Sequence, residues 1–282
     1  MISVMERRVP ARDGLILAAL DWAGDPSRTP ILCLTGICRT ARDYEGLAER
    51  HAGRRRVVAL DYMGHGDSAR APDVSRYRPE RALADILDAC AALHLPRAVV
   101  VGTSFGGLMA MFLSLARPSM LRGVVLNDIG PRVESDGLDV VTRFAGNDPG
   151  FASLDDAVPY IRSVMPRLPL PDEAAWLRFA DLTYRRGEDG RFHPRWDTRI
   201  VQAMEGDGAG GDFGPVFRGL RPVPTMLVWG ERSEILSAAT MRAMVRDKPD
   251  LEVVTLPGAG HAPTLGEPAV AARMDAFLGA IP

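Results

Sequence analysis

The chain has 282 residues, of which 46% are hydrophobic and 25% charged, with a net charge of −2 and a pI of about 6.2. This composition is typical of one large globular domain or of a domain with an inserted module. It lacks the basic excess that nucleic-acid or anionic-membrane partners require. Because the first thirty residues lack a basic, apolar leader and no apolar run reaches about 18 residues, we expect a cytoplasmic protein without a membrane partner.

Lysine and cysteine usage disfavours several chemistries. The single lysine, Lys248, lies in a polar run where we expect a solvated helix end or turn. Schiff-base and P-loop chemistry need a lysine in a specific setting and are therefore disfavoured. The three cysteines match no zinc spacing. Cys33 and Cys90 lie in apolar patterns and are predicted to be small core residues.

The predicted elements begin with a hairpin of residues 4–9 and 15–22 around the Asp13-Gly14 turn. Short apolar runs then recur at residues 31–34, 57–60, 98–101, 124–126, 225–229 and 251–256. Runs without alternation are typical of strands buried on both faces of a parallel sheet. Helical segments between them, such as the amphipathic residues 83–93, predict an α/β fold with a mostly parallel, doubly wound sheet.

The alternation of apolar strands and helices stops between residues 131 and 224. This stretch is rich in aromatic residues and has amphipathic segments such as 172–184. We predict a helical insertion, a cap or lid, over the end of the sheet where α/β proteins bind ligands. Residues 1–130 and 225–282 then form the core. Most of the aromatic rings are expected to form the small core of the insertion itself rather than to contact substrate.

The segment Gly102-Thr103-Ser104-Phe105-Gly106 contains a candidate nucleophile. It follows a predicted strand and opens a predicted helix over residues 108–116. That setting strains the turn and lifts the serine hydroxyl above the sheet edge, while the glycines leave room for a tight backbone. We predict that Ser104 is a nucleophile; the alternative is an ordinary glycine-rich turn.

A serine hydroxyl needs a base to take its proton. His261 has the expected setting, a loop directly after the last predicted strand. His65 lies in a tight loop after a strand, where a structural role is expected. The remaining histidines lie at a polar helix end, at the close of an amphipathic helix and within the insertion, at positions 51, 94 and 193.

A carboxylate should hold the tautomer of the imidazole, and in hydrolases of this layout it precedes the histidine in the chain. The loop after residues 225–229 contains Glu231 and Glu234, and we prefer Glu234. Asp128, at the end of the strand that follows the nucleophile, is the alternative. Glu231 is expected to face solvent.

Acyl transfer also needs donors aimed at the developing oxyanion. We expect the backbone N–H of Phe105 and that of Ile37, in the loop after residues 31–34. Arg39, in the same loop, is a candidate for binding a substrate carboxylate, although a surface role is the commoner one for a loop arginine.

Over nearly its whole length the chain resembles the α/β-hydrolase fold superfamily. The resemblance rests on the leading hairpin, the loop at Gly36, Asp61-x-x-Gly64-x-Gly66-x-Ser68, the Ser104 turn, the insertion and the His261 loop. Two departures stand out. The usual His-Gly before the oxyanion residue reads Thr35-Gly36. The usual place of the acid, three residues after the strand-end glycine, holds Ser233, with Glu234 one residue further on.

The resemblance implies hydrolysis through an acyl-enzyme without a cofactor or metal. Serine at position 104 disfavours the epoxide hydrolases and haloalkane dehalogenases of this fold, which use an aspartate there. We expect a hydrolase of a small, largely apolar carboxylic ester or lactone. The alternatives are a C–C bond hydrolase of a diketone or ring-fission product and a non-catalytic ligand receptor on the same fold. The oligomeric state is open.

Overall fold

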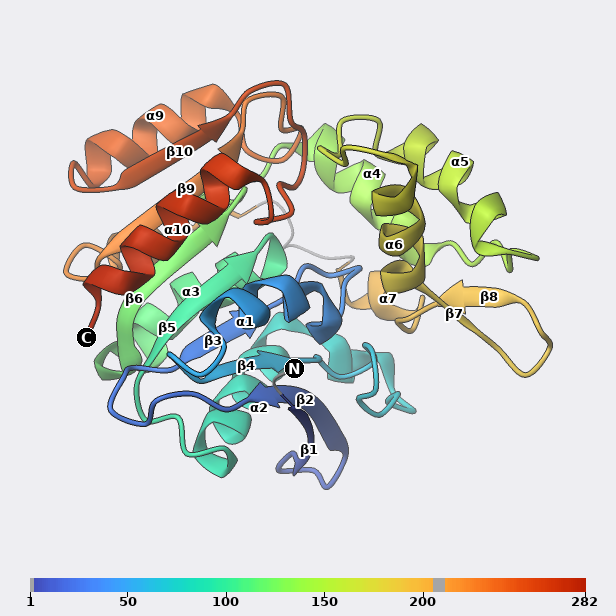
Figure 1. Cartoon of the computed structure of the whole chain (residues 1–282), viewed down its shortest axis with the longest axis horizontal. Coiled ribbons are helices and arrows are strands. Elements are labelled where there is room, and N and C mark those ends of the chain that lie inside the picture. Colours follow the sequence, from blue (N-terminus) through green and yellow to red (C-terminus); the bar gives the residue numbers. More distant parts are fainter. Residues whose placement is uncertain (1–2, 205–210) are drawn as a thin grey trace.

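A central sheet runs through the computed structural model, which describes residues 3–204 and 211–282 (Figure 1). Within these residues the sheet has eight strands in the order β1-β2-β4-β3-β5-β6-β9-β10. They are β1 (Val4–Pro10), β2 (Ile16–Trp22), β3 (Ile31–Leu34), β4 (Val57–Leu60), β5 (Ala98–Thr103), β6 (Leu121–Asn127), β9 (Thr225–Gly230) and β10 (Glu252–Leu256). The pairs β1–β2 and β2–β4 are antiparallel and all the others are parallel, which confirms the predicted sheet.

Helices cover both faces of the sheet. The α-helices of the core are α1 (Glu45–His51), α2 (Pro79–Ala92), α3 (Phe105–Ala116), α9 (Ala238–Asp247) and α10 (Pro268–Ala280). Alternate residues of a strand point to opposite faces. Leu32 and Leu34 accordingly join the apolar cluster of α2, α3 and α9, whereas Ile31 and Cys33 join that of α1 and α10. Figure 1 shows α1 and α10 in front of the sheet.

We call residues 131–224 the insertion, and its residues 135–204 lie to the right of the sheet in Figure 1. The described part contains α4 (Ser135–Gly146), α5 (Leu154–Val164), α6 (Glu173–Thr183), α7 (Ile200–Met204), α8 (Gly214–Arg218) and the hairpin β7 (Tyr184–Arg186) with β8 (Phe192–Pro194). The hairpin was not predicted, and residues 205–210 of the predicted insertion lie outside the described residues. Trp176 and Tyr184 belong to a separate apolar cluster within the insertion, as expected, whereas Phe144, Trp196 and Phe217 join the cluster of α2, α3 and α9 in the core.

Short 3-10 helices complete the core, namely η1 (Ala41–Tyr44), η2 (Val74–Tyr77) and η3 (Pro118–Met120).

The expectation that Lys248 is solvated is wrong, because its side chain is only 1% exposed. Its ammonium group donates hydrogen bonds to the carbonyl of Arg221 and to the carboxylate of Asp250. The long apolar stem of lysine can be buried while its charge keeps polar partners, and the polar neighbours in the sequence concealed this.

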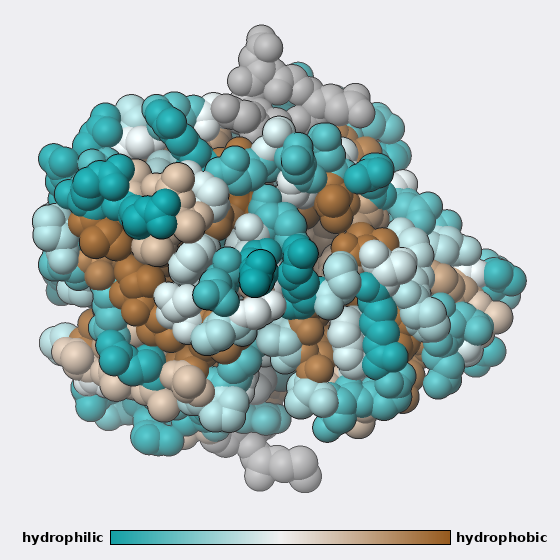
Figure 2. Space-filling model, turned by 90° about the horizontal axis from the view of Figure 1, so that it is seen from above, coloured by the Kyte–Doolittle hydropathy of each residue, from teal (hydrophilic) through white to brown (hydrophobic). Residues whose placement is uncertain are grey.

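Apolar residues (brown) gather in separate areas between hydrophilic residues (teal) on the face shown in Figure 2. Within the described residues, the large apolar side chains that are exposed come from β1, α3 and α9, namely Val4, Met5, Leu115 and Val245. No helix in the described ranges combines the length and the apolar character needed to cross a bilayer.

Candidate active site

Ser104 stands on a sharp turn between β5 and α3. Its backbone has φ +50° and ψ −116°, a region that residues other than glycine rarely adopt. A Cβ on Gly106 would lie 2.0 Å from the carbonyl oxygen of Leu34, and one on Gly102 would lie 2.5 Å from the backbone of Gly106. The glycines are therefore needed for the helix to begin so close to the sheet.

His261 connects Ser104 to a buried carboxylate. Its Nε2 lies 2.9 Å from Ser104 Oγ and its Nδ1 lies 2.8 Å from Asp128 Oδ2. An ionised carboxylate only accepts hydrogen bonds, so Nδ1 carries the proton and Nε2 accepts from the serine hydroxyl. This is the arrangement in which an imidazole can take the proton of a nucleophile while its own charge is stabilised.

Asp128 is fully buried and held by further donors. Its Oδ1 accepts the Gly230 N–H at 2.9 Å, and its Oδ2 accepts the Ser233 hydroxyl at 2.6 Å. Asp128 directly follows β6, and Gly230 ends β9, its neighbour in the sheet. The ends of these two strands therefore meet beside His261.

The preference for Glu234 as the partner of His261 is wrong in this structure. Glu234 forms an ion pair with Arg167 of the insertion, and its side chain is 39% exposed. Asp128, the alternative, makes the contact instead. The signal that distinguishes them was present in the sequence, because Ser233 occupies the usual place of the acid, and it now hydrogen-bonds to Asp128.

The loop of residues 35–39 passes close to Ser104, and we call it the oxyanion loop after the role predicted for it from the sequence. A Cβ on Gly36 would lie 3.6 Å from the Cβ of Ser104. The Arg39 N–H donates to the Gly36 carbonyl at 3.1 Å, which closes a turn with Ile37 near its centre. No described residue accepts a hydrogen bond from the Ile37 N–H. The Phe105 N–H belongs to the first residue of α3, where intrahelical partners are absent.

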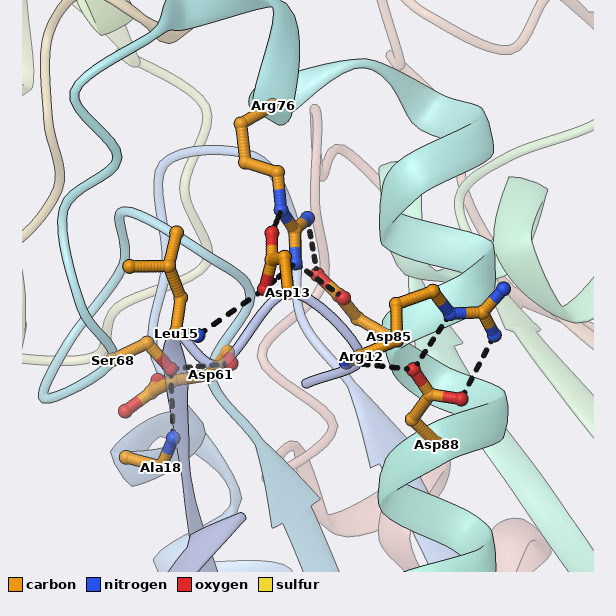
Figure 3. Close-up of polar contacts among 9 residues, drawn as sticks. All are labelled: Arg12, Asp13, Leu15, Ala18, Asp61, Ser68, Arg76, Asp85 and Asp88. Atoms are coloured by element: carbon orange, nitrogen blue, oxygen red, sulfur yellow. Dashed lines mark hydrogen bonds and ion pairs between the residues drawn. The ribbon is translucent and has the colours of Figure 1, made fainter. Parts of the chain in front are cut away.

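Asp61 fixes the chain directly after the oxyanion loop. Its buried carboxylate accepts the Ala41 N–H at 2.7 Å and the Asp67 N–H at 3.2 Å. Burial raises the pKa of Asp61 to about 6, although these hydrogen bonds oppose the shift. Ser68 Oγ donates to the Asp61 carbonyl and accepts the Ala18 N–H, as Figure 3 shows. The motif of residues 61–68 thus ties β2 to the segment that follows the oxyanion loop.

Figure 3 also shows an ionic network at the β1–β2 turn. Arg76 pairs with Asp13 of the turn and with Asp85 of α2, and Arg12 pairs with Asp88 of the same helix. These contacts join the leading hairpin to α2, so the network serves the fold of the core.

A cavity of about 700 Å³ reaches Ser104 and His261. A cavity of this volume can hold a drug-sized molecule. The insertion contributes mainly apolar side chains to its wall, including Val141, Phe144, Met165, Leu168, Phe179 and Leu182.

Arg39 lines this cavity, but its charge is already compensated. The guanidinium donates two hydrogen bonds to Asp43 at 2.5 and 2.6 Å and a third to Thr183 Oγ1 at 2.5 Å. It also lies 3.9 Å from the ring centroid of Phe179. Arg39 therefore links the oxyanion loop to α6 of the insertion, a role that the sequence did not indicate.

A mostly parallel eight-stranded sheet with an insertion over one end defines an α/β-hydrolase architecture. The chain belongs to the Alpha/beta hydrolase family, whose model matches residues 31–274. It is similar to a 3-hydroxybutyrate-oligomer hydrolase of Cupriavidus necator, with 28% identity over 94% of this chain and 93% of the relative. It is also 28% identical to a 2-(acetamidomethylene)succinate hydrolase of Mesorhizobium japonicum, over 82% of this chain and 81% of that one. A solved α/β hydrolase from Novosphingobium aromaticivorans superimposes with a TM-score of 0.94 at 37% identity, covering 99% of both chains.

Proposed function

We propose that this hydrolase cleaves a small, largely apolar carboxylic ester or lactone through an acyl-enzyme. The observation that carries the proposal is the continuous contact from Ser104 through His261 to Asp128 at the wall of an apolar cavity. Ser104 Oγ attacks the carbonyl carbon while His261 takes its proton. Asp128 stabilises the resulting imidazolium.

The Phe105 and Ile37 N–H groups hold the oxyanion of the tetrahedral intermediate. His261 then protonates the leaving alcohol, and the acyl group stays on Ser104. In the second half His261 takes a proton from water, whose oxygen attacks the acyl carbon. The bond from that carbon to Ser104 Oγ then breaks, His261 returns the proton to Oγ, and the acid is released. The Cupriavidus relative supports the choice of bond, since its name gives a hydroxy-acid oligomer as substrate and such oligomers are joined by esters.

The test is hydrolysis of p-nitrophenyl acetate and butyrate by the wild type, Ser104→Ala, Asp128→Asn and Glu234→Gln. We expect Ser104→Ala to lower kcat by about 10⁶-fold and Asp128→Asn to lower it by about 10⁴-fold. Glu234→Gln should stay within about tenfold, because Glu234 contacts Arg167 rather than His261. If Glu234→Gln lost its activity and Asp128→Asn kept it, Glu234 would be the carboxylate that assists His261. A wild type inactive on every ester would contradict the proposed bond.

A second candidate is a carboxylate-bearing substrate, which includes the C–C cleavage of a ring-fission diketone acid by the same three residues. Four arginines line the cavity, namely Arg39, Arg42, Arg167 and Arg178, and guanidinium groups suit carboxylates. Each already pairs with Asp43, Glu45 or Glu234, so a substrate carboxylate would displace one of these partners. The Mesorhizobium relative is also named for a succinate. A kcat/KM for a diketone acid that exceeds that for every neutral ester would favour this candidate.

A further inference from the structure

The loop of residues 61–68 packs a buried histidine against the oxyanion loop. His65 is 2% exposed, and its Nε2 lies 2.5 Å from the carbonyl oxygen of Ile37. Its Nδ1 lies 3.1 Å from the carbonyl oxygen of Met63. Both ring nitrogens thus face acceptors, whereas a neutral imidazole has a single N–H to donate.

The proton of His65 belongs on the nitrogen that faces Ile37. Burial lowers the pKa of His65, although the two carbonyls and the nearby Asp197 oppose the shift, so the ring is neutral around pH 7. The contact to Ile37, at 2.5 Å, is shorter than the contact to Met63, at 3.1 Å. The Nε2–H therefore donates to the Ile37 carbonyl.

That carbonyl belongs to the peptide between Ile37 and Cys38, inside the turn that the Arg39 N–H closes onto Gly36. Rotation of the central peptide converts one turn type into another and changes the backbone angles of the residues on either side. A hydrogen bond to its oxygen resists this rotation. His65 thereby restrains the backbone of Ile37, whose N–H is the proposed oxyanion donor.

The insertion holds His65 in place from the other side. The Gly66 N–H donates to the Arg195 carbonyl, and the Asp197 N–H donates to the Gly64 carbonyl, both at 2.7 Å. Trp196, between these two insertion residues, is 1% exposed. The loop that presents His65 is therefore fixed between the insertion and the oxyanion loop.

We propose that His65 is a positioning residue that sets the Ile37 oxyanion donor by holding the Ile37 carbonyl. The inference rests on the proposed function, because it assigns a purpose to the Ile37 N–H. Among the described residues, His65 has no hydrogen bond to Ser104 or His261, so we assign its effect to the backbone of the oxyanion loop.

The test compares His65→Leu, which removes the donor, with His65→Gln, whose amide N–H can replace it. With p-nitrophenyl butyrate, we expect His65→Leu to lower kcat by about 10- to 100-fold with KM within about threefold, because a misplaced donor weakens transition-state binding. His65→Gln should recover most of the loss. Affinity for an alkyl trifluoromethyl ketone, which adds to Ser104 Oγ and leaves an oxyanion while the proton passes to His261, should fall by a similar factor.

Ser68→Ala is the matched control, since Ser68 anchors the same loop to β2 and Asp61 without contacting Ile37. It should lower stability yet keep kcat within about threefold. Equal losses of kcat in Ser68→Ala and His65→Leu would overturn the positioning role, as would a His65→Leu enzyme with wild-type kcat.

Amide hydrogen exchange separates failure of the inference from failure of the proposed function. The Arg39 N–H, which is bonded within the turn, should exchange about tenfold faster in His65→Leu than in the wild type or Ser68→Ala. A wild type without esterase activity would contradict the proposed function. The exchange rate of the Arg39 N–H would still show whether His65 restrains the oxyanion loop. Unchanged exchange in His65→Leu would overturn the positioning of the loop.

Discussion

Asp128 and Ser233 show how a single site can draw its acid from either of two strands. The two residues follow β6 and β9, which are adjacent and parallel, and Ser233 Oγ lies 2.6 Å from the same Asp128 oxygen that contacts His261. A carboxylate at position 233 would therefore begin within reach of the imidazole. In this chain position 128 holds the aspartate and position 233 holds a serine, so Asp128 is the residue that contacts His261.

This proximity predicts that the acid can be moved. Asp128→Asn should lower kcat for p-nitrophenyl butyrate by about 10⁴-fold, because an amide at Oδ2 disfavours the required tautomer of His261. Adding Ser233→Asp should restore at least about tenfold of that loss, since the new carboxylate faces Nδ1 from the neighbouring strand. Steady-state kinetics of the single and double variants measure the recovery.

Ser233→Ala alone is the control, because it removes one hydrogen bond to Asp128 but leaves the carboxylate in place. We expect a loss of about tenfold or less. A double variant no more active than Asp128→Asn would show that position 233 cannot reach His261.

At the scale of elements, the loop of residues 61–68 depends on a glycine that no side chain could replace. Gly66 has φ +51°, and a Cβ there would lie 2.1 Å from a carboxylate oxygen of Asp61. Gly66→Ala should therefore lower the free energy of unfolding by at least about 3 kcal/mol, since a steric collision adds to the backbone strain. Chemical denaturation measures the change.

Gly14→Ala separates the collision from the strain. Gly14 has φ +83°, and nothing lies within 4 Å of a Cβ at that position. This variant should cost about 1 kcal/mol, which is the cost of a left-handed backbone alone. If both variants lost the same stability, the contact with Asp61 would not be what requires glycine at position 66.

The elements that the sequence predicted well are those buried on both sides. The runs at 31–34 and 57–60 match β3 and β4, because a doubly covered strand leaves an unbroken apolar signature. The β7–β8 hairpin escaped prediction since its strands have three residues each and lack a period. The acid was misassigned because Glu234 lies only one residue beyond the usual place of the acid, whereas the contact of Ser233 with Asp128 depends on the adjacency of β6 and β9 in the folded sheet.

At the scale of the whole molecule, the cavity lies between the core and the insertion. Side-chain contacts around the cavity join these two parts of the chain. Arg167 of the insertion pairs with Glu234 of the core, and Arg178 pairs with Glu45. All of these side chains are partly exposed, so each pair contributes no more than about 1 kcal/mol. The polar contacts therefore orient the insertion, while its apolar side chains set the character of the cavity.

An apolar wall predicts that activity depends on acyl length. Across p-nitrophenyl acetate, butyrate and hexanoate, kcat/KM should rise by up to about fourfold per methylene, which corresponds to about 0.8 kcal/mol for each buried group. Val141, on α4, lines the cavity. Val141→Trp should reduce kcat/KM for the hexanoate by at least about tenfold and leave that for the acetate within about threefold, because the added ring takes up space needed only by the longer chain.

Arg143→Trp places the same ring at an exposed position on α4 that does not line the cavity. It should leave the whole length profile unchanged, which separates filling of the cavity from a general effect of tryptophan on this helix. A profile that is flat in the wild type, or that Val141→Trp lowers equally for all three esters, would mean that the acyl chain does not extend along the insertion. The apolar wall would then have to contact the leaving group, and varying the alcohol at constant acyl length would reveal the dependence instead.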